Sequence, residues 1–309
     1  MTRLVCIAAL ITVLMIALIP AAFAQTTNPK WDVTNFGAPF PTPTGKDRDT
    51  ASVAADGKGL IFVLRRAEPP VLVYNREGKL VDSWGTGLFV DTHNIDVDRF
   101  GFVWIGDRNG QVVYKFTKEG KQVMAIGTKG VKGDDTSEYA FNRASDVFVA
   151  PNGDIYVADG YVNHRVVQYT KDGKFIRIIG GVKGDEPGKF DEVHGVQMDS
   201  KGRLIIMDHH SNGARVQIFD VNGKFIQEWP HASLGIMMGS GLTIDATDTI
   251  YIGDTDGQQI KVVKDGKVLD TIGGLNARPH QITLDTGTGT IYAADTAAVG
   301  GMVKKIVKK

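Results

Sequence analysis

The stretch SDVFVAPNGDIYVAD, residues 145–159, decides the fold class of this 309-residue chain. It places two short runs of alternating apolar residues on either side of the turn sequence Pro-Asn-Gly, and it closes on an aspartate. Alternating apolar residues around a tight turn are typical of paired antiparallel strands that each bury one face. The stretch therefore predicts a β-hairpin.

The same pattern occurs six times, and the start points of the copies lie 40 to 52 residues apart. The other copies are ASVAADGKGLIFVLR (51–65), HNIDVDRFGFVWIGD (93–107), HGVQMDSKGRLIIMD (194–208), SGLTIDATDTIYIGD (240–254) and HQITLDTGTGTIYAAD (280–295). A second hairpin turn, an acidic residue or Asn followed by Gly-Lys, recurs at 77–79, 119–121, 172–174, 222–224 and 265–267. Four strands in roughly 45 residues are the period of a propeller blade. We therefore predict an all-β, six-bladed β-propeller with four-stranded blades, because a β-sandwich would not explain a motif that returns at this interval.

The sixth unit has only three strands before the chain ends at Lys309. A missing outer strand would leave an open sheet edge. We predict that the N-terminal stretch Trp31 to Phe36 pairs there and closes the ring.

Residues 1–24 resemble a secretory signal peptide, with Arg3, an apolar run and the small-residue site Ala22-Phe23-Ala24. The alternative is an uncleaved anchor, because the apolar run is nearly long enough to span a bilayer. Cleavage leaves one propeller domain at 25–309, secreted or periplasmic and no longer attached to a membrane. It would also remove Cys6, the one cysteine, so that any metal must be bound by His or carboxylate.

The charge balance bears on partners. The chain has 35 basic and 35 acidic side chains and a formal net charge of zero, so nucleic acid is not an expected partner. We expect a monomer that acts on a small molecule or a peptide.

Histidine alternates with a small residue at the position that begins each repeat. These positions are Ala51, His93, Ser145, His194, Ser240 and His280. First strands line the channel of a propeller, and alternate blades lie about 120° apart, so three imidazoles should converge on one point. Three imidazoles with an open fourth position suit a catalytic Zn²⁺. The alternative is that each histidine only hydrogen-bonds neighbouring backbone at a strand start.

The aspartate that closes each repeat recurs too regularly to be catalytic, and we expect it to accept backbone N–H bonds in the turn after the second strand. The first repeat has Arg65-Arg66 at this place, and the third continues as Asp159-Gly160-Tyr161. Departures from a repeat mark positions at which function is expected.

With these features the sequence resembles the NHL-repeat propellers, and more narrowly the peptidyl-α-hydroxyglycine α-amidating lyases, over residues 50–309. The resemblance rests on Trp84-Gly85, Ser145-Asp146-Val147, Asp159-Gly160-Tyr161 with Asn163 and Arg165, Pro187-Gly188 and Pro279-His280. It implies that His93, His194 and His280 bind zinc, that Tyr161 is the catalytic base and that Arg66 binds the substrate carboxylate. The implied reaction splits a peptidyl-α-hydroxyglycine into an amide and glyoxylate, and cations that lower the pKa of Tyr161 would assist it.

Two departures from the family pattern concern the third histidine. Arg278 replaces a methionine and adds a cation that would bind an anionic substrate or face solvent. Gln281 replaces an aspartate that binds a structural calcium, which argues against Ca²⁺ here, although Gln and backbone carbonyls are oxygen ligands. Two other functions stay open: a non-catalytic NHL propeller that binds a partner through the loops at 128–142 and 180–193, and a Ca²⁺-dependent, lactonase-like hydrolase, which would need carboxylate and Asn ligands.

Overall fold

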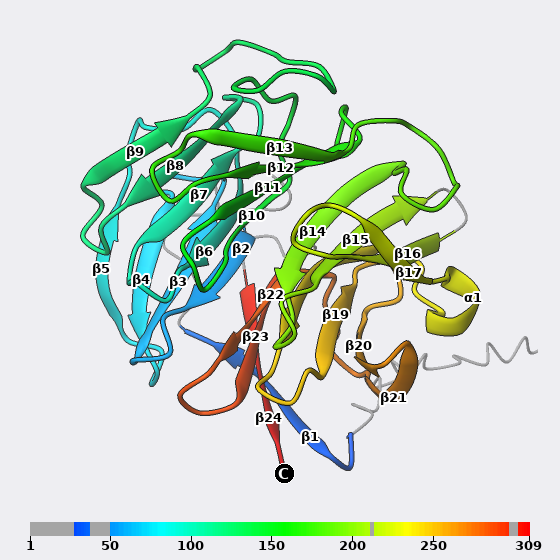
Figure 1. Cartoon of the computed structure of the whole chain (residues 1–309). Helices are drawn as coiled ribbons and strands as arrows, with labels where there is room; N and C mark the ends of the chain where they lie inside the picture. Colours follow the sequence, from blue (N-terminus) through cyan, green and yellow to red (C-terminus); the bar gives the residue numbers. More distant parts are fainter. Residues whose placement is uncertain (1–27, 38–49, 211–212, 297–301) are drawn as a thin grey trace, which may run out of the picture.

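The computed structural model describes residues 28–37, 50–210, 213–296 and 302–309, which form six four-stranded antiparallel sheets. The innermost strands of successive sheets contact one another in a closed cycle: β2 to β6, β10, β14, β18, β22 and back to β2. The sheets are therefore the blades of a six-bladed propeller (Figure 1), as the sequence predicts.

In blades 1 to 5 the four strands are arranged in chain order, with the first strand at the channel and the fourth strand outermost. Blade 1 holds β2 (Thr50–Ala55), β3 (Leu60–Arg65), β4 (Val71–Asn75) and β5 (Leu80–Trp84), and blade 2 holds β6 (Thr92–Val97), β7 (Val103–Asp107), β8 (Val112–Phe116) and β9 (Gln122–Ile126). Blade 3 holds β10 (Asp146–Val149), β11 (Ile155–Asp159), β12 (Arg165–Tyr169) and β13 (Phe175–Gly180), and blade 4 holds β14 (Glu192–Met198), β15 (Leu204–His210), β16 (Gly213–Phe219) and β17 (Phe225–Trp229). Blade 5 holds β18 (Gly239–Ile244), β19 (Ile250–Asp254), β20 (Gln259–Lys264) and β21 (Lys267–Ile272). A short helix, α1 (His231–Leu234), connects blades 4 and 5.

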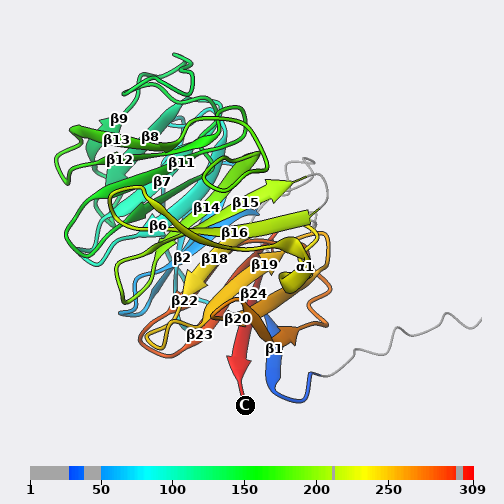
Figure 2. The same ribbon diagram turned by 45° about the vertical axis from the view of Figure 1, so that its right-hand side comes forward.

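Blade 6 is built from both ends of the described chain. It contains β22 (Pro279–Asp285), β23 (Thr290–Asp295) and β24 (Met302–Lys308), with β1 (Trp31–Phe36) as its outermost strand. Trp31 lies opposite Lys308, and Phe36 lies opposite Val303. Figures 1 and 2 both show β1 (blue) beside β24 (red). The predicted closure by an N-terminal strand is confirmed.

The apolar core lies between the blades. Buried side chains form six clusters, and each cluster joins two neighbouring blades. Trp104 of blade 2, for example, packs in one cluster with Val147 and Val157 of blade 3. Every blade thus depends on both neighbours, which fixes the positions of the innermost strands around the channel.

The recurring turns have the conformation that their sequences predict. The glycines of the five Gly-Lys turns all have positive φ angles, between 74° and 83°. Glycine adopts this left-handed region without the steric cost that a side chain adds.

The closing aspartates accept hydrogen bonds mainly from the segment before the first strand of the blade, and not from the turn after the second strand as expected. Asp208 accepts the backbone N–H groups of Asp191 and Glu192, just before the first strand of its own blade, and Asp107 does the same with Val90 and Asp91. Asp254 and Asp295 repeat this arrangement in blades 5 and 6. Bonds in the following turn exist too, from Gly110 and Gly257, but the main effect is to fix the segment that leads into each first strand.

Residues 1–24, predicted as a signal peptide, lie outside the described residues. Within the described part, no helix is both long and apolar enough to cross a bilayer.

Candidate metal centre and its arginine rim

The three histidines of the alternating pattern meet in the channel. His93, His194 and His280 each offer a ring nitrogen, and these atoms all lie within 4.8 Å of one another. The exposed fractions of the three residues are only 0%, 1% and 8%. Among the described residues this is the one group of three or more His, Cys, Asp or Glu side chains with ligand atoms so close. The repeat therefore brings together residues that lie far apart in the sequence.

The neighbouring blade orients two of the three imidazoles. His93 Nδ1 lies 2.7 Å from the carbonyl oxygen of Ser145, and His280 Nδ1 lies 3.0 Å from that of Ala51. His194 Nδ1 is buried and has no hydrogen-bond partner among the described residues. For His93 and His280 the carbonyl belongs to the residue that begins the next repeat. A carbonyl partner fixes the Nδ1–H tautomer and leaves the Nε2 lone pair for another ligand.

Burial keeps these imidazoles neutral. It lowers the pKa of His93 and His194 well below 6.5, and it lowers the pKa of His280 to about 3. Positive charges nearby, including Arg66 and Arg108, act on His93 in the same direction. Neutral imidazole is the form that binds metals, so the site needs no proton loss before a cation enters.

Tyr161 reaches the centre of this group. Its hydroxyl lies 2.8 Å from His93 Nε2 and 3.1 Å from His194 Nε2. A phenol has one proton, so it can donate to only one of two acceptor nitrogens. The other imidazole lone pairs then point into the same space with no hydrogen atom to share. Such an arrangement suits a bound cation. Three neutral imidazoles match the donor set of catalytic zinc sites.

The local sequence explains the position of Tyr161. The β11 strand ends at Asp159, which accepts the Asn142 N–H and anchors the segment before the first strand of blade 3. A Cβ atom on Gly160 would lie 1.8 Å from the carbonyl oxygen of Val193. Only glycine lets the chain pass this close to the residue that precedes His194, and the next residue then points its ring at the histidines.

The pKa of Tyr161 is not lowered on balance, so the condition under which nearby cations would assist this base is not met. Arg108 and Arg66 do act to lower it, but burial of the ring is the larger influence, and the pKa of Tyr161 is raised. The sequence indicates cations near Tyr161, but it does not show that the ring is buried, and burial opposes the effect of these cations on the pKa. In this structure the phenol is protonated at neutral pH.

Arg66 lies at the channel mouth, the end at which the first strands begin. Its Nε is 3.3 Å from Asp91 Oδ1, and its side chain is 19% exposed. Asp91 also binds Arg108, whose Nη2 is 2.6 Å from Oδ2 and whose guanidinium lies 5.1 Å from the Tyr161 ring centre. One carboxylate thus holds two guanidinium groups next to the phenol.

Arg278 and Gln281 lie apart from this arginine pair. Arg278 forms an ion pair with Asp256 on the rim, where the Arg278 side chain is 31% exposed. Gln281 is buried and lines a cavity of about 470 Å³ together with Asp96 and Asp146. Its Nε2 has no hydrogen-bond partner among the described residues. Binding of substrate by Arg278 and binding of calcium near Gln281 stay predictions.

The sequence analysis missed other residues at the mouth. His209 stacks on His194 with ring centres 4.8 Å apart, and its Nδ1 lies 3.3 Å from Glu192 Oε1. His209 and Arg108 each follow a closing aspartate directly, as Arg66 follows Arg65. Aligning the repeats one residue beyond the closing position would have identified both.

Sequence comparisons are consistent with this architecture. Residues 141–169 match the family model described as NHL repeat. The human NHL repeat-containing protein 3 is 28% identical over 272 residues, which are 81% of this chain and 77% of the relative. A probable peptidyl-alpha-hydroxyglycine alpha-amidating lyase of Caenorhabditis elegans is 32% identical over 151 residues, covering 48% of this chain and 42% of the relative. The mouse peptidyl-glycine alpha-amidating monooxygenase is 28% identical over 74% of this chain, which spans a quarter (25%) of that protein.

Solved structures share the fold at low sequence identity. A streptogramin B lyase matches with a TM-score of 0.64 and 14% identity, covering 91% of this chain and 98% of the other. A gluconolactonase from Xanthomonas campestris matches with a TM-score of 0.66 and 12% identity, covering 91% and 99%. The chain is thus a six-bladed propeller that contains one NHL-repeat match and is homologous to proteins named as amidating lyases, and the solved structures that share its fold include a gluconolactonase.

Proposed function

We propose that the protein is a secreted, zinc-dependent lyase that cleaves peptidyl-α-hydroxyglycine-like carbinolamides to an amide and glyoxylate. The observation that carries the proposal is the meeting of three buried, neutral imidazoles, two of which contact the Tyr161 hydroxyl. Homology to proteins named as amidating lyases supports the same chemistry.

His93, His194 and His280 would hold the metal through Nε2. A bound Zn²⁺ supplies Lewis acidity, which makes a nearby hydroxyl group more acidic. In His93 and His280 the Nδ1 atom is held by a backbone carbonyl oxygen. This contact fixes the orientation of the ring, so that Nε2 points toward the metal position. The protein therefore contributes a preformed site.

Tyr161 is the proposed proton acceptor. The substrate loses the proton of its carbinol hydroxyl, the carbon–nitrogen bond breaks, and the departing amide nitrogen takes up a proton, so the reaction has no net proton change. Burial favours the protonated phenol, and a cation held by the histidines would favour the phenolate instead. The phenolate form of Tyr161 would then accept the first proton, and the resulting phenol carries the one that the nitrogen needs. Arg66 would orient the glyoxylate end of the substrate through its carboxylate.

The test uses protein that begins at residue 25 and is loaded with zinc. It is incubated with an N-acyl-α-hydroxyglycine, and glyoxylate release is measured. We expect turnover with about one zinc per chain, and loss of both in His194→Ala. His231→Ala is the matched control, because His231 is exposed on α1, outside the first position of every repeat. Zinc-loaded protein that releases no glyoxylate would contradict the proposal.

The test also separates the alternatives. A non-catalytic binding protein is the second candidate, because the name of NHL repeat-containing protein 3 states no enzymatic activity, and bound zinc without turnover would support it. A lactonase-like hydrolase should instead bind calcium through carboxylates, whereas the ligand group found here consists of histidines.

A further inference from the structure

A ring of charged residues surrounds the channel mouth two positions before each first residue of the repeat. In blades 2 to 6 these residues are Asp91, Arg143, Glu192, Met238 and Arg278. Four of the five are charged, and all lie in the segments that lead into the innermost strands. Their side chains therefore decide the charge that a ligand meets on its way to the histidines.

Three of the charged residues contact a basic or acidic side chain. Asp91 pairs with Arg108, Glu192 contacts His209, and Arg278 pairs with Asp256. Arg143 has no ion-pair partner within the described part of the chain. In blades 2 and 4 the partner directly follows the closing aspartate, but in blade 3 that position is Gly160, which has no side chain. The close approach of Gly160 to Val193 thus leaves Arg143 without a counter-ion.

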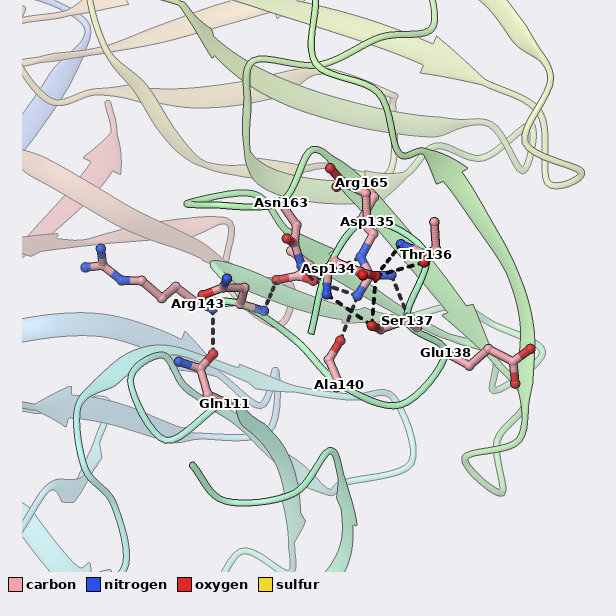
Figure 3. Close-up of polar contacts among 12 residues, drawn as sticks. Gln111, Asp134, Asp135, Thr136, Ser137, Glu138, Ala140, Arg143, Asn163 and Arg165 are labelled. Carbon is pink, nitrogen blue, oxygen red and sulfur yellow. Dashed lines mark hydrogen bonds and ion pairs between the residues drawn. The ribbon is translucent and has the colours of Figure 1, made fainter. Parts of the chain in front are cut away.

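The backbone holds Arg143 in an unusual conformation. Its φ angle is 69°, in the left-handed region that costs a non-glycine residue free energy, and its N–H donates to Gln111 Oε1 over 2.7 Å. Figure 3 shows the guanidinium pointing away from Asp134, Asp135 and Glu138, the acidic residues of the same loop. It lies 5.4 Å from the Tyr161 ring centre, and its Nε is buried without a hydrogen-bond partner.

Three guanidinium groups act on Tyr161 or lie near its ring. Arg66 and Arg108 both contact the carboxylate of Asp91, and Glu192 is a second negative charge that acts on Tyr161, whereas Arg143 has no carboxylate partner among the described residues. A partly buried cation without a counter-ion is costly unless a ligand supplies the opposite charge. If Arg66 binds the carboxylate of the hydroxyglycine, Arg143 is still a guanidinium without a carboxylate partner among the described residues.

We propose that Arg143 binds a second carboxylate of the substrate. The preferred substrate is then an N-acyl-α-hydroxyglycine whose acyl part carries a carboxylate, such as a peptide with an acidic residue before the hydroxyglycine. The inference rests on the proposed lyase function for the identity of the first carboxylate. Arg143 acts as a specificity-determining residue beside Tyr161, and the cost of its left-handed backbone is offset when the anion binds.

The kinetic test compares two substrates that differ by one charge. N-succinyl-α-hydroxyglycine has the second carboxylate, and N-succinamoyl-α-hydroxyglycine has a neutral amide of nearly the same shape. We expect kcat/KM of the unaltered protein to be about tenfold higher for the succinyl compound, as one charge-assisted hydrogen bond allows. In Arg143→Gln this preference should vanish, and in Arg143→Lys part of it should return.

Arg99→Gln is the control, because it removes one positive charge from an exposed residue at the opposite end of the channel. It should keep the full preference. An unaltered protein with equal kcat/KM for both substrates would overturn the inference, and so would Arg143→Gln with an unchanged preference. The comparison of substrates on the unaltered protein decides the matter even if a variant fails to fold.

A binding experiment separates this inference from the lyase proposal. Calorimetry of the zinc-loaded protein with succinate and with succinamate should give a several-fold lower Kd for succinate, and Arg143→Gln should remove the difference. Charge selectivity without glyoxylate release would uphold the anion site and reject the lyase function. Glyoxylate release without charge selectivity would uphold the lyase function and reject the anion site.

Discussion

The Tyr161 hydroxyl lies 2.8 Å from Nε2 of His93, so the phenol and the imidazole face the same point in the channel. A group held at that point would contact both side chains. This relationship makes Tyr161 a candidate for proton transfer and not merely for packing.

Tyr161→Phe removes the hydroxyl and keeps the ring. We expect kcat for glyoxylate release to fall about 100-fold or more, because general base catalysis typically contributes that much. Zinc content, measured by elemental analysis, should stay unchanged, since the three histidines remain. Tyr139→Phe, the same change on a tyrosine that is 49% exposed, should leave kcat unaffected. Equal loss of zinc and activity in Tyr161→Phe would contradict a base role.

Gly160→Ala tests the close contact between blades 3 and 4. The added Cβ would lie 1.8 Å from the Val193 carbonyl oxygen, so the backbone must move. We expect the free energy of unfolding to fall by about 1–3 kcal/mol or more, as overpacking typically costs, together with a lower kcat as Tyr161 shifts. Urea unfolding measures the first effect. Gly273→Ala is the control, because no atom lies within 4 Å of its added Cβ. A neutral result at Gly160 would show that the contact is dispensable.

The buried histidines predict acid sensitivity of the metal-free protein. Their pKa values are lowered by burial in the folded state, while the unfolded chain titrates near 6.5. Below pH 6.5 the unfolded state therefore binds more protons, and stability falls as the pH falls. Each histidine contributes a slope of about 1.4 kcal/mol per pH unit. Urea unfolding between pH 7.5 and 5 should show this slope, and His280→Asn should make it shallower. A slope unaffected by His280→Asn would refute this origin.

Phe36 tests the closure of the ring. It is 6% exposed, and its ring centre lies 5.8 Å from that of Tyr74 in blade 1 and 4.8 Å from that of Tyr292 in blade 6. Phe36→Ala should lower the free energy of unfolding by about 3–5 kcal/mol. In a protein of this size that corresponds to a melting temperature lower by about 10 °C. Thr34→Ala on the exposed side of β1 should change little. An unchanged melting temperature in Phe36→Ala would mean that β1 does not hold the blades together.

The repeat made the fold predictable from sequence. Six copies of one pattern indicated the blades, and the incomplete sixth copy located the closing strand at Trp31 to Phe36. The convergence of the three histidines followed from the same alignment, because equivalent positions of a propeller form a ring. Because the blades repeat around one axis, the positions of residues within the repeat were enough to predict which of them meet in the channel.

Other features required the structure. Arg108, Arg143 and His209 lie next to the first and closing positions of the repeat, where the regular pattern is found, and not at them. The pKa of Tyr161 depends on how far its ring is buried, which composition does not reveal. The left-handed backbone of Arg143 follows from its contact with Gln111, a partner 32 residues away in sequence.

The pairing of β1 with β24 sets an order of events in folding. Residues 31–36 pair with residues 302–308, so the ring cannot close before residues 302–308 have been synthesised. Until then blade 6 lacks its outer strand. Completion of the ring thus follows the formation of the other five blades, and a chain that has not reached residue 302 stays open.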